Sequence, residues 1–320
     1  MTAYVPFGHE CETGGNRSVA QGRRSKLMAL TEALDVVEPG CFLGIGGGGH
    51  ETRPVASVHE LIRRGTGGLR LVGGPSAGYD IDLLIGCGLV AETFIPAVTM
   101  GELGMAPMFR AAGESGEVKL HLLDVLTLVA GYQASALGLP FFPVDAWRGT
   151  QVVEHNPFVT ALPDPFAGTF AVRPLVPDVA LLHGAEGDEF GNVRSYAPMR
   201  SMDQYLAAAS RKVIVTVDRL VSNDAIRREP ELTTIPGIRV DAVCLVPFGA
   251  YPTACPPLYP ADVDHLAFYR AAAEAKRLGD TAAYQQYLDR YVLSVRSADD
   301  YVDRVSADRA GRLRIPADMA

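Results

Sequence analysis

The sequence lacks an apolar run long enough to cross a membrane, because every stretch of eighteen residues contains a charge, a proline or a glycine. Residues 1–26 are polar and lack the apolar core of a secretory signal. These two absences argue against a membrane-spanning or exported protein. We therefore expect a cytoplasmic protein without a membrane partner.

Cysteines are few, and none of them belongs to a C-x-x-C pair. An odd, scattered set indicates reduced thiols rather than a disulfide framework or a structural zinc site; the five cysteines are Cys11, Cys41, Cys87, Cys244 and Cys255. The seven histidines form no H-x-x-x-H or similar array. We therefore predict no metal site.

Basic residues are also in deficit, with 29 lysines and arginines against 37 acids and a net charge of −8. No basic face is available to neutralise a phosphate backbone, which argues against sequence-independent binding of nucleic acid. The 320 residues are 48% hydrophobic and 21% charged. That composition is typical of a globular protein with a large core, built as one large domain or two fused ones.

Strand and helix signals alternate through the first half of the sequence, which is the α/β pattern. The expected strands are apolar at most positions, as in a parallel sheet that is covered on both faces, and cover residues 41–46, 69–73, 90–98, 118–123 and 140–144. The expected helices carry apolar residues at spacings of three and four, and cover residues 53–64, 79–85, 104–115 and 124–137. We predict an open, mostly parallel sheet with helices on both faces.

The second half begins with a proline-containing segment, residues 150–177, that indicates a long surface excursion. Turn residues at 188–192 predict a hairpin between two strands. A helix at 201–210 and strands at 212–217 and 240–246 complete the expected core. Three short amphipathic stretches predict a C-terminal helical cap and cover residues 263–278, 281–293 and 298–305.

The most informative motif is a run of four glycines, Gly46 to Gly49, directly after an apolar strand and before an amphipathic stretch. Such a loop can turn sharply and present bare N–H groups, and the following helix end favours anions. The run therefore predicts a cradle for a phosphate or a carboxylate. A second glycine turn, Gly74-Pro-Ser-Ala-Gly78, is expected to line the same crevice. The alternative of a pliable connector stays open.

Two other interpretations of these glycines are weaker. The pattern Gly44-x-Gly46-x-x-Gly49 matches a dinucleotide fingerprint, but the next strand ends without the acid that would hold a ribose. The G-x-S-x-G pattern would make Ser76 a hydrolase nucleophile, with His183 or His265 as its base. Neither histidine has a supporting motif around it, so we favour a structural turn.

One acid and one histidine remain as candidates for the chemistry. Glu102 follows an apolar strand at the expected carboxyl edge of the sheet, where ligands bind, and is the candidate nucleophile of this chain. It could instead be an N-terminal acid of the helix expected at 104–115, which is the interpretation we favour. His50, beside the glycine run, is a candidate substrate contact.

Seven blocks of the sequence together resemble the A-subunit of glutaconate CoA-transferase, which is the α subunit of a family I CoA-transferase. They stand in the family's order and cover residues 46–54, 69–78 with 82–86, 136–143, 207–218, 235–243, 246–253 and 284–305. The resemblance covers residues 27–306, with a core at 27–246 and a C-terminal cap at 247–306. It leaves an N-terminal extension at 1–26 and a tail at 307–320.

The resemblance implies that the catalytic residue lies on a different chain. In these transferases a glutamate on the β-type chain attacks the acyl-CoA thioester, which gives a mixed anhydride, then an enzyme thioester with CoA, and finally a new acyl-CoA. It thus implies a β-type partner, with an acyl-CoA and a carboxylic or dicarboxylic acid as substrates. Coenzyme A is a substrate in this scheme, and no cofactor is permanently bound.

The resemblance also implies that this chain forms the wall facing that glutamate. Backbone N–H groups there would hold a carboxylate or an oxyanion, and the implied binding residues are Gly46, Gly47, Gly48, Gly49, His50, Arg53, Gly74, Ser76, Ala77 and Gly78. Arg53 would pair bidentately with a free carboxylate of the substrate. Its alternative role is a surface charge at the start of a helix.

Two further functions stay open within this resemblance. The ring-opening CoA-ester hydrolases of steroid degradation look like this fold but carry an acidic dyad near the start of the fourth helix. Here that site reads Asp124-Val125, and valine cannot act as a base or a nucleophile. The chain could also be a non-catalytic homologue that binds acyl-CoA without turnover.

Overall fold

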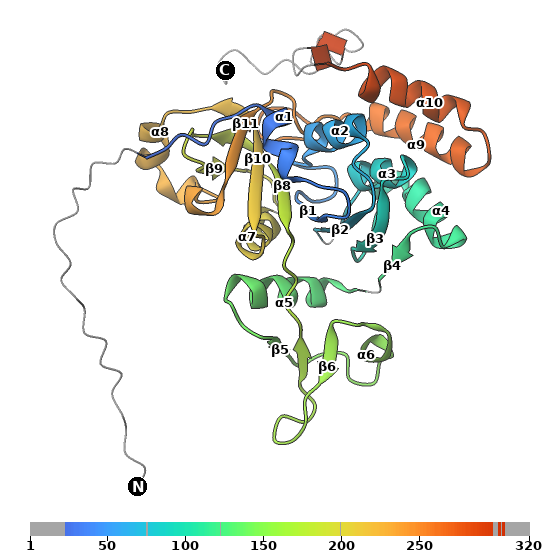
Figure 1. Cartoon of the computed structure of the whole chain (residues 1–320), viewed down its shortest axis with the longest axis vertical. Coiled ribbons are helices and arrows are strands. Elements are labelled where there is room, and N and C mark those ends of the chain that lie inside the picture. The colour runs from blue at the N-terminus through green and yellow to red at the C-terminus, as the bar shows by residue number, and fades with distance from the viewer. Residues whose placement is uncertain are drawn as a thin grey trace, which may run out of the picture.

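The computed structural model describes residues 23–74, 76–121, 123–198, 200–296, 300–301 and 303–304. Within them an open sheet is flanked by helices, and a smaller sheet stands apart below α5 (Val125–Ala136) in Figure 1. The predicted N-terminal extension and C-terminal tail fall almost entirely outside the described residues, as does part of the helix expected at 298–305.

The main sheet is parallel except for the pairing of a short strand with the end of a central strand, which confirms the predicted fold class. Its hydrogen-bonded order is β11-β10-β8-β1-β2-β3-β4, and β9 pairs antiparallel with β8. The strands are β1 (Phe42–Ile45), β2 (Leu69–Gly73), β3 (Val90–Phe94), β4 (Lys119–Leu120), β8 (Val179–Gly187), β9 (Val193–Arg194), β10 (Lys212–Leu220) and β11 (Ala242–Leu245). The antiparallel pair of β8 and β9 is the hairpin predicted around residues 188–192.

Two helix ends show how the local sequence supplies caps. At the start of α5 the Asp124 side chain accepts a hydrogen bond from the Thr127 N–H, and α2 ends at Gly65 in the left-handed conformation. The remaining α-helices are α1 (Leu30–Ala33), α2 (Val55–Arg64), α3 (Tyr79–Gly86), α4 (Pro107–Ser115), α6 (Val152–His155), α7 (Arg200–Ala209), α8 (Asn223–Arg228), α9 (Val263–Arg277) and α10 (Ala282–Leu288).

Alternate strand residues pack against helices on opposite faces of the sheet. Leu43 and Leu181 belong to a buried cluster that contains residues of α2, α3, α4, α9 and α10. Ala180, Leu182 and Val215 belong to a second cluster with α5 and α7. Since side chains along a strand point alternately to the two faces, both faces of the sheet are covered, as the apolar strands predicted.

The strand expected at residues 140–144 exists, but its assignment to the main sheet is wrong. β5 (Phe142–Val144) pairs antiparallel with β7 (Phe170–Val172), which also pairs with β6 (Val159–Ala161). This small sheet packs against α5 through a cluster formed by Ala130, Val144, Val159 and Val172. The expected surface excursion therefore contains two of the three strands of a small separate layer.

The expected C-terminal helices pack on the face of the sheet that carries α3 and α4 (Figure 1). α10 continues into a π-helical turn, Asp289–Leu293, and tyrosines from both helices are buried against α3. Among the described residues, no helix combines the length and the apolar character needed to span a bilayer.

Candidate functional site

The candidate site lies at the carboxyl edge of the main sheet, where the strand order reverses. The chain runs from β1 outward to β4 and later fills the other side with β8, β10 and β11, so β1 and β8 flank the switch point at which open α/β sheets bind ligands. Three loops meet there. Gly49 donates its N–H to the Ser76 carbonyl at 2.8 Å, and Ala254 donates to the His50 carbonyl at 2.7 Å.

All four N–H groups of the glycine loop are bonded to acceptors within the protein. Their acceptors are the Leu181 carbonyl for Gly46, the Asp203 Oδ1 for Gly47, the Glu51 carbonyl for Gly48 and the Ser76 carbonyl for Gly49, at 2.7 to 3.1 Å. Gly46, Gly47 and Gly48 are also buried. The groups expected to cradle an anion are thus used to hold the loop in shape.

The shape of this loop requires glycine at Gly47. Its φ is +77°, and a Cβ placed there would lie 2.7 Å from the carbonyl oxygens of Glu51 and Thr52. Real Cβ atoms do not approach backbone this closely. Thr52 is itself buried with a φ of 47°, an unusual value for a β-branched residue. The chain is therefore tightly folded back on itself between Gly47 and Thr52, and the strain falls at the candidate site.

Arg53 has a role that neither sequence interpretation anticipated. Its side chain is fully buried, so the interpretation as a surface charge is wrong. Nη2 lies 2.8 Å from Asp80 Oδ2, Nε donates to the same carboxylate at 2.9 Å, and Nη1 donates to the Gly47 carbonyl at 3.0 Å. The guanidinium is thus already paired inside the protein, where it links the glycine loop to α3.

Asp203 is a site residue that the sequence interpretation missed. It is 1% exposed on α7, and its Oδ1 accepts from the Gly47 N–H at 2.7 Å. Burial raises the pKa of this carboxyl to about 6, against the lowering influence of the Gly47 N–H and the Arg53 charge. The sequence did contain a signal for this role. Asp203 stands three residues before the buried Leu206, so it lies on the apolar face of an amphipathic helix, where an acid is unusual.

An open groove of about 710 Å³ lies beside the glycine loop. His50, Glu51 and Glu102 line it together with Val263 at the start of α9 and residues from the loop after β11, namely Ala254, Pro256, Pro257, Leu258, Tyr259, Pro260 and Ala261. The His50 Nε2 is 2.9 Å from the Met100 carbonyl, while its buried Nδ1 has no hydrogen-bond partner among the described residues. The structure therefore brings the two predicted candidates, His50 and Glu102, to one groove.

Glu102 lies in a short 3-10 turn, Gly101–Leu103, and not at a helix N-terminus. α4 begins only at Pro107, because Gly104 has a φ of +96° and interrupts the helical pattern. The interpretation of Glu102 as an N-terminal helix acid is therefore wrong. Its side chain is exposed along the groove, where substrate or a partner chain has access to it.

The second glycine turn supports the first but does not form a hydrolase triad. Gly74, Ala77 and Gly78 are buried, while Ser76 is partly exposed and accepts the Gly49 N–H through its carbonyl. His183 is held by Thr216 and Asp218. His265 lies within hydrogen-bond distance of two buried tyrosines, Tyr251 and Tyr287. Both histidines expected as bases therefore serve other contacts.

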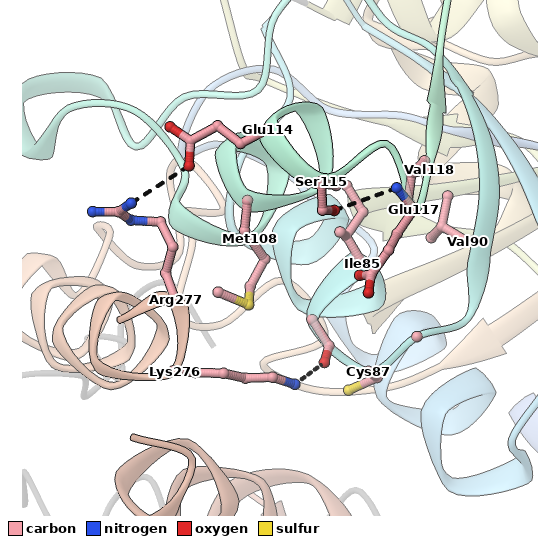
Figure 2. A pocket seen from close by; sticks show the side chains of 14 residues that line it. Ile85, Cys87, Val90, Met108, Glu114, Ser115, Glu117, Val118, Lys276 and Arg277 are labelled. Carbon is pink, nitrogen blue, oxygen red and sulfur yellow. Dashed lines mark hydrogen bonds and ion pairs between the residues drawn. The ribbon is translucent and has the colours of Figure 1, made fainter. Parts of the chain in front are cut away.

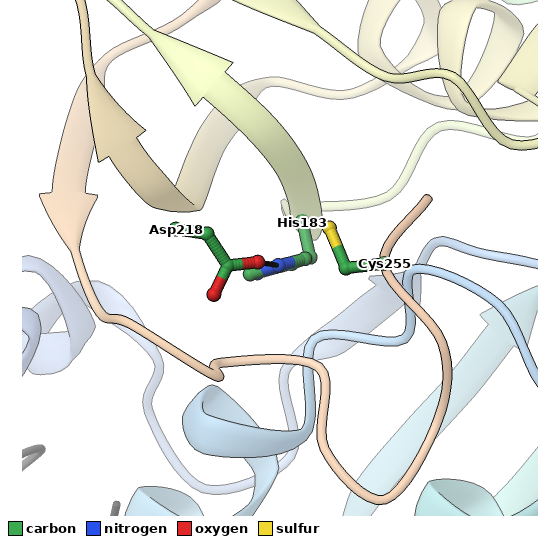
Figure 3. A group of neighbouring side chains, drawn as sticks. All are labelled: His183, Asp218 and Cys255. Atoms are coloured by element: carbon green, nitrogen blue, oxygen red, sulfur yellow. Dashed lines mark hydrogen bonds and ion pairs between the residues drawn. The ribbon is translucent and has the colours of Figure 1, made fainter. Parts of the chain in front are cut away.

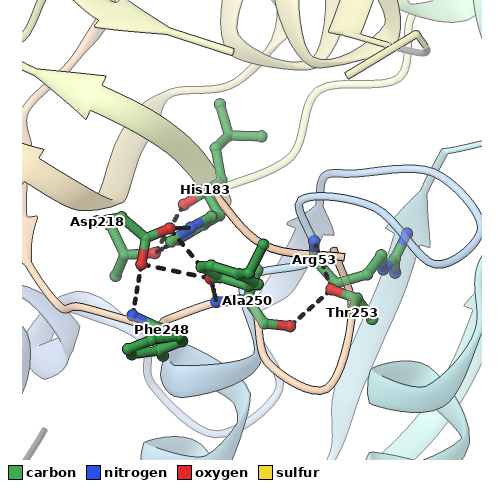
Figure 4. Close-up of polar contacts among 9 residues, drawn as sticks. Arg53, His183, Asp218, Phe248, Ala250 and Thr253 are labelled. Carbon is green, nitrogen blue, oxygen red and sulfur yellow. Dashed lines mark hydrogen bonds and ion pairs between the residues drawn. The ribbon is translucent and has the colours of Figure 1, made fainter. Parts of the chain in front are cut away.

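His183, Asp218 and Cys255 form a buried cluster behind the groove (Figure 3). Their potential metal-ligating atoms lie within 4.8 Å of one another, although histidine spacing along the sequence gave no sign of it. His183 Nε2 is 2.8 Å from Asp218 Oδ2, and the same carboxylate accepts from the Phe248 N–H and the Tyr259 hydroxyl. These contacts, drawn in Figure 4, make the cluster a closed hydrogen-bonded support for the loop after β11.

A second hollow, of about 920 Å³, opens at the amino edge of the sheet, away from this site (Figure 2). Two cations face it, but Arg277 is paired with Glu114 and Glu274, and the Lys276 ammonium donates to the Gly86 carbonyl. Cys87 lies beside them, and burial raises the pKa of its thiol to about 11. Both cations of this hollow thus have partners within the protein, and its cysteine is not a thiolate.

The fold and the groove define an α/β protein with an open groove at the carboxyl edge of its strands, the place where open α/β sheets bind ligands. A family model described as Coenzyme A transferase matches residues 27–245. The chain belongs to the coenzyme A transferase family, whose chemistry is the transfer of CoA.

Individual relatives agree with this membership. The chain is 30% identical to the A-subunit of glutaconate CoA-transferase of Acidaminococcus fermentans, over 91% of this chain and 95% of that relative. The crystal structure of glutaconate coenzyme A-transferase from that organism superposes with a TM-score of 0.82, at 28% identity over 90% of this chain and 94% of the other. A cholesterol ring-cleaving hydrolase IpdA subunit of Rhodococcus jostii is 28% identical, over 87% and 95% of the two chains.

An uncharacterized protein of Archaeoglobus fulgidus is 32% identical over 89% of this chain. The present chain spans 63% of the length of that relative.

Proposed function

We propose that this chain is the α-type subunit of a heteromeric CoA-transferase that moves CoA from an acyl-CoA to a free carboxylic acid. The partner is a β-type subunit that carries the catalytic glutamate. The observation that carries the proposal is the near full-length similarity, in sequence and in fold, to the A-subunit of glutaconate CoA-transferase. A dicarboxylic acid acceptor is the substrate class that this similarity favours.

The geometry of the groove supports a role as one half of a shared pocket. It is open along one side, and its acids, Glu51 and Glu102, lie at its partly exposed surface. A nucleophilic carboxylate that forms a covalent intermediate has to be held at a fixed position. Glu102 sits on a short exposed turn, so the attacking carboxylate is supplied from outside this chain.

The members of the predicted binding set contribute in two ways. Gly49, His50 and Ser76 are partly exposed and form the surface that meets the acyl-CoA. Gly46, Gly47, Gly48, Arg53, Gly74, Ala77 and Gly78 lie behind that surface and fix its shape. A rigid wall of this kind orients the thioester for attack, which is how positioning lowers the barrier of a transfer reaction.

Coenzyme A is a substrate in this scheme, and the enzyme needs no resident cofactor. The cytoplasm is the compartment we assign, in line with the four described cysteines, which are all free thiols. The excess of acids is consistent with partners that are proteins and small carboxylates rather than nucleic acids.

The test is reconstitution with a β-type partner. The chain alone is expected to be inert, and the mixture is expected to form glutaconyl-CoA from acetyl-CoA and glutaconate. Hydroxylamine or borohydride trapping followed by mass mapping should place the glutamyl thioester on the partner. Steady release of free CoA without an acceptor acid would instead indicate a hydrolase, and acyl-CoA binding without turnover would indicate a non-catalytic homologue.

Two matched variants test whether the nucleophilic carboxylate comes from this chain or from the partner. Glu102→Gln is expected to keep transfer activity, because the residue is a groove wall and not the nucleophile. Glu117→Gln is the control, since Glu117 is equally exposed but lies at the far hollow. A thioester mapped to Glu102, or complete loss of activity in E102Q alone, would contradict the proposed division of labour.

A further inference from the structure

The Gly47 backbone is bound on both sides by buried ionisable groups. Asp203 on α7 accepts its N–H at 2.7 Å, and Arg53 donates to its carbonyl at 3.0 Å. Arg53 and Asp203 are 0% and 1% exposed, respectively. A neutral loop peptide is thus held between a carboxylate from one side of the sheet and a guanidinium from the other.

Burying Asp203 in this place carries an electrostatic penalty that its contacts do not fully offset. Its Oδ2 is buried and has no hydrogen-bond partner among the described residues. An unsatisfied carboxylate oxygen in the interior is unfavourable. Asp203 also fills the space beside Gly46, where a Cβ would lie 2.7 Å from its Oδ1. The side chain therefore fits the glycine loop closely, and the burial of its charge offsets part of the stability that the Gly47 hydrogen bond contributes.

The position of Gly47 is transmitted to the wall of the groove by a short series of backbone bonds. Gly48 and Glu51 exchange two hydrogen bonds, at 3.1 and 3.0 Å. Beyond them, Thr52 donates to the Ala254 carbonyl and Ala254 donates to the His50 carbonyl, both at 2.7 Å. His50 and Glu51 line the groove. A shift of the Gly47 peptide would therefore displace both of these residues.

We propose that Asp203 is a positioning residue for the transfer reaction: together with Arg53 it fixes the Gly47 peptide groups and thereby places His50 and Glu51 in the groove wall. The inference rests on the proposed function in one respect, namely that the groove receives the acyl-CoA. The hydrogen bond from Gly47 is the essential contact, and the negative charge of Asp203 is not. A side chain that keeps an acceptor at Oδ1 should therefore preserve the wall.

The first experiment measures the loop directly by hydrogen–deuterium exchange of a peptide spanning residues 46–52. Asp203→Ala removes the acceptor and is expected to speed exchange by about tenfold or more, because the lost bond has a charged acceptor. Asp203→Asn keeps an acceptor and is expected to stay within about threefold of the wild-type rate. Unchanged exchange in D203A, or equally fast exchange in D203N, would overturn the proposal.

Asp82 supplies a matched control for general loss of stability. It is a fully buried side chain on α3 whose Oδ1 accepts the Phe109 N–H at 2.8 Å and whose Oδ2 accepts from the Tyr269 hydroxyl, so its side-chain bonds reach α4 and α9 rather than the glycine loop. Asp82→Ala should lower the melting temperature but leave exchange of residues 46–52 unaltered. If D82A loosened the loop as much as D203A, the effect of Asp203 would be structural in general and the proposal would be wrong.

The second experiment measures kcat/KM with acetyl-CoA and glutaconate after reconstitution with the β-type partner. D203A is expected to lose about tenfold or more, while D203N and D82A stay within about threefold. A wild-type complex without transfer activity would refute the proposed function, while the exchange data would still decide the role of Asp203. If D203A does not fold, Asp203→Glu is the second variant, because it displaces the acceptor by one methylene. D203E must then speed hydrogen–deuterium exchange of residues 46–52, or the proposal fails.

Discussion

Gly47 and Gly49 offer a sharp comparison, because both have a positive φ in the same four-residue loop but differ in the space around them. The φ values are +77° and +56°. A Cβ at Gly49 would meet nothing within 4 Å, so Gly49→Ala should lose only the left-handed backbone penalty of about 1–2 kcal/mol. A Cβ at Gly47 would lie 2.7 Å from two backbone carbonyl oxygens. Relief of that overlap adds about 1–3 kcal/mol.

Movement of Gly47 would also break its hydrogen bonds to Asp203 and Arg53, each of which involves a buried charged group. Such bonds contribute about 1.5–3 kcal/mol. Gly47→Ala should therefore lower the free energy of unfolding by about 5 kcal/mol or more in total, measured by urea denaturation followed by circular dichroism. Equal losses for G47A and G49A would refute the reasoning, because the loop would then not be sterically closed at Gly47.

Two further perturbations test the buried charges. Asp80→Ala leaves the Arg53 guanidinium buried and without its ion-pair partner. Urea denaturation should therefore show that the free energy of unfolding falls by about 3–5 kcal/mol. A fall of less than about 1 kcal/mol would contradict this, because it would mean that water reaches the guanidinium. Asp82 has its pKa raised to about 7 by burial, from 3.8. The folded state therefore holds a proton that the unfolded state releases, and wild-type stability falls as pH rises from about 4 to about 7. The asparagine of Asp82→Asn cannot ionise. The free energy of unfolding of D82N, relative to that of wild type, should therefore rise by up to about 4 kcal/mol between about pH 4 and about pH 7 and stay level above that range. Urea denaturation at several pH values measures this difference, and a difference that does not change with pH would contradict the prediction.

Much of the main sheet could be predicted because its strands are buried on both faces. Residues 69–73 are apolar at most positions and coincide with β2, and the expected helix at 79–85 differs from α3 by one residue. The strand at 140–144 has the same apolar texture, yet its partner is β7, a short strand within a proline-containing segment. The spacing of apolar residues and the composition of a strand do not specify which sheet the strand joins.

The site was less accessible to the sequence, because its contacts join residues that lie far apart in the chain. Arg53 stands at the start of a helix, where an exposed charge is common, and its partner Asp80 follows 27 residues later. Asp203 reaches Gly47 across 156 residues. The glycine run lies at the switch point of the sheet, but the acceptors for its N–H groups are set by tertiary packing and could not be predicted.

The tie between Gly47 and Asp203 bears on the order in which the molecule matures. The loop belongs to the first quarter of the chain, yet its conformation depends on α7 and on the segment around Ala254. A nascent chain that ends before residue 200 would contain every glycine of the loop without the contacts that shape it. The site therefore becomes able to bind a partner and a substrate only late, after the segment around Ala254 has been synthesised and has packed against the glycine loop.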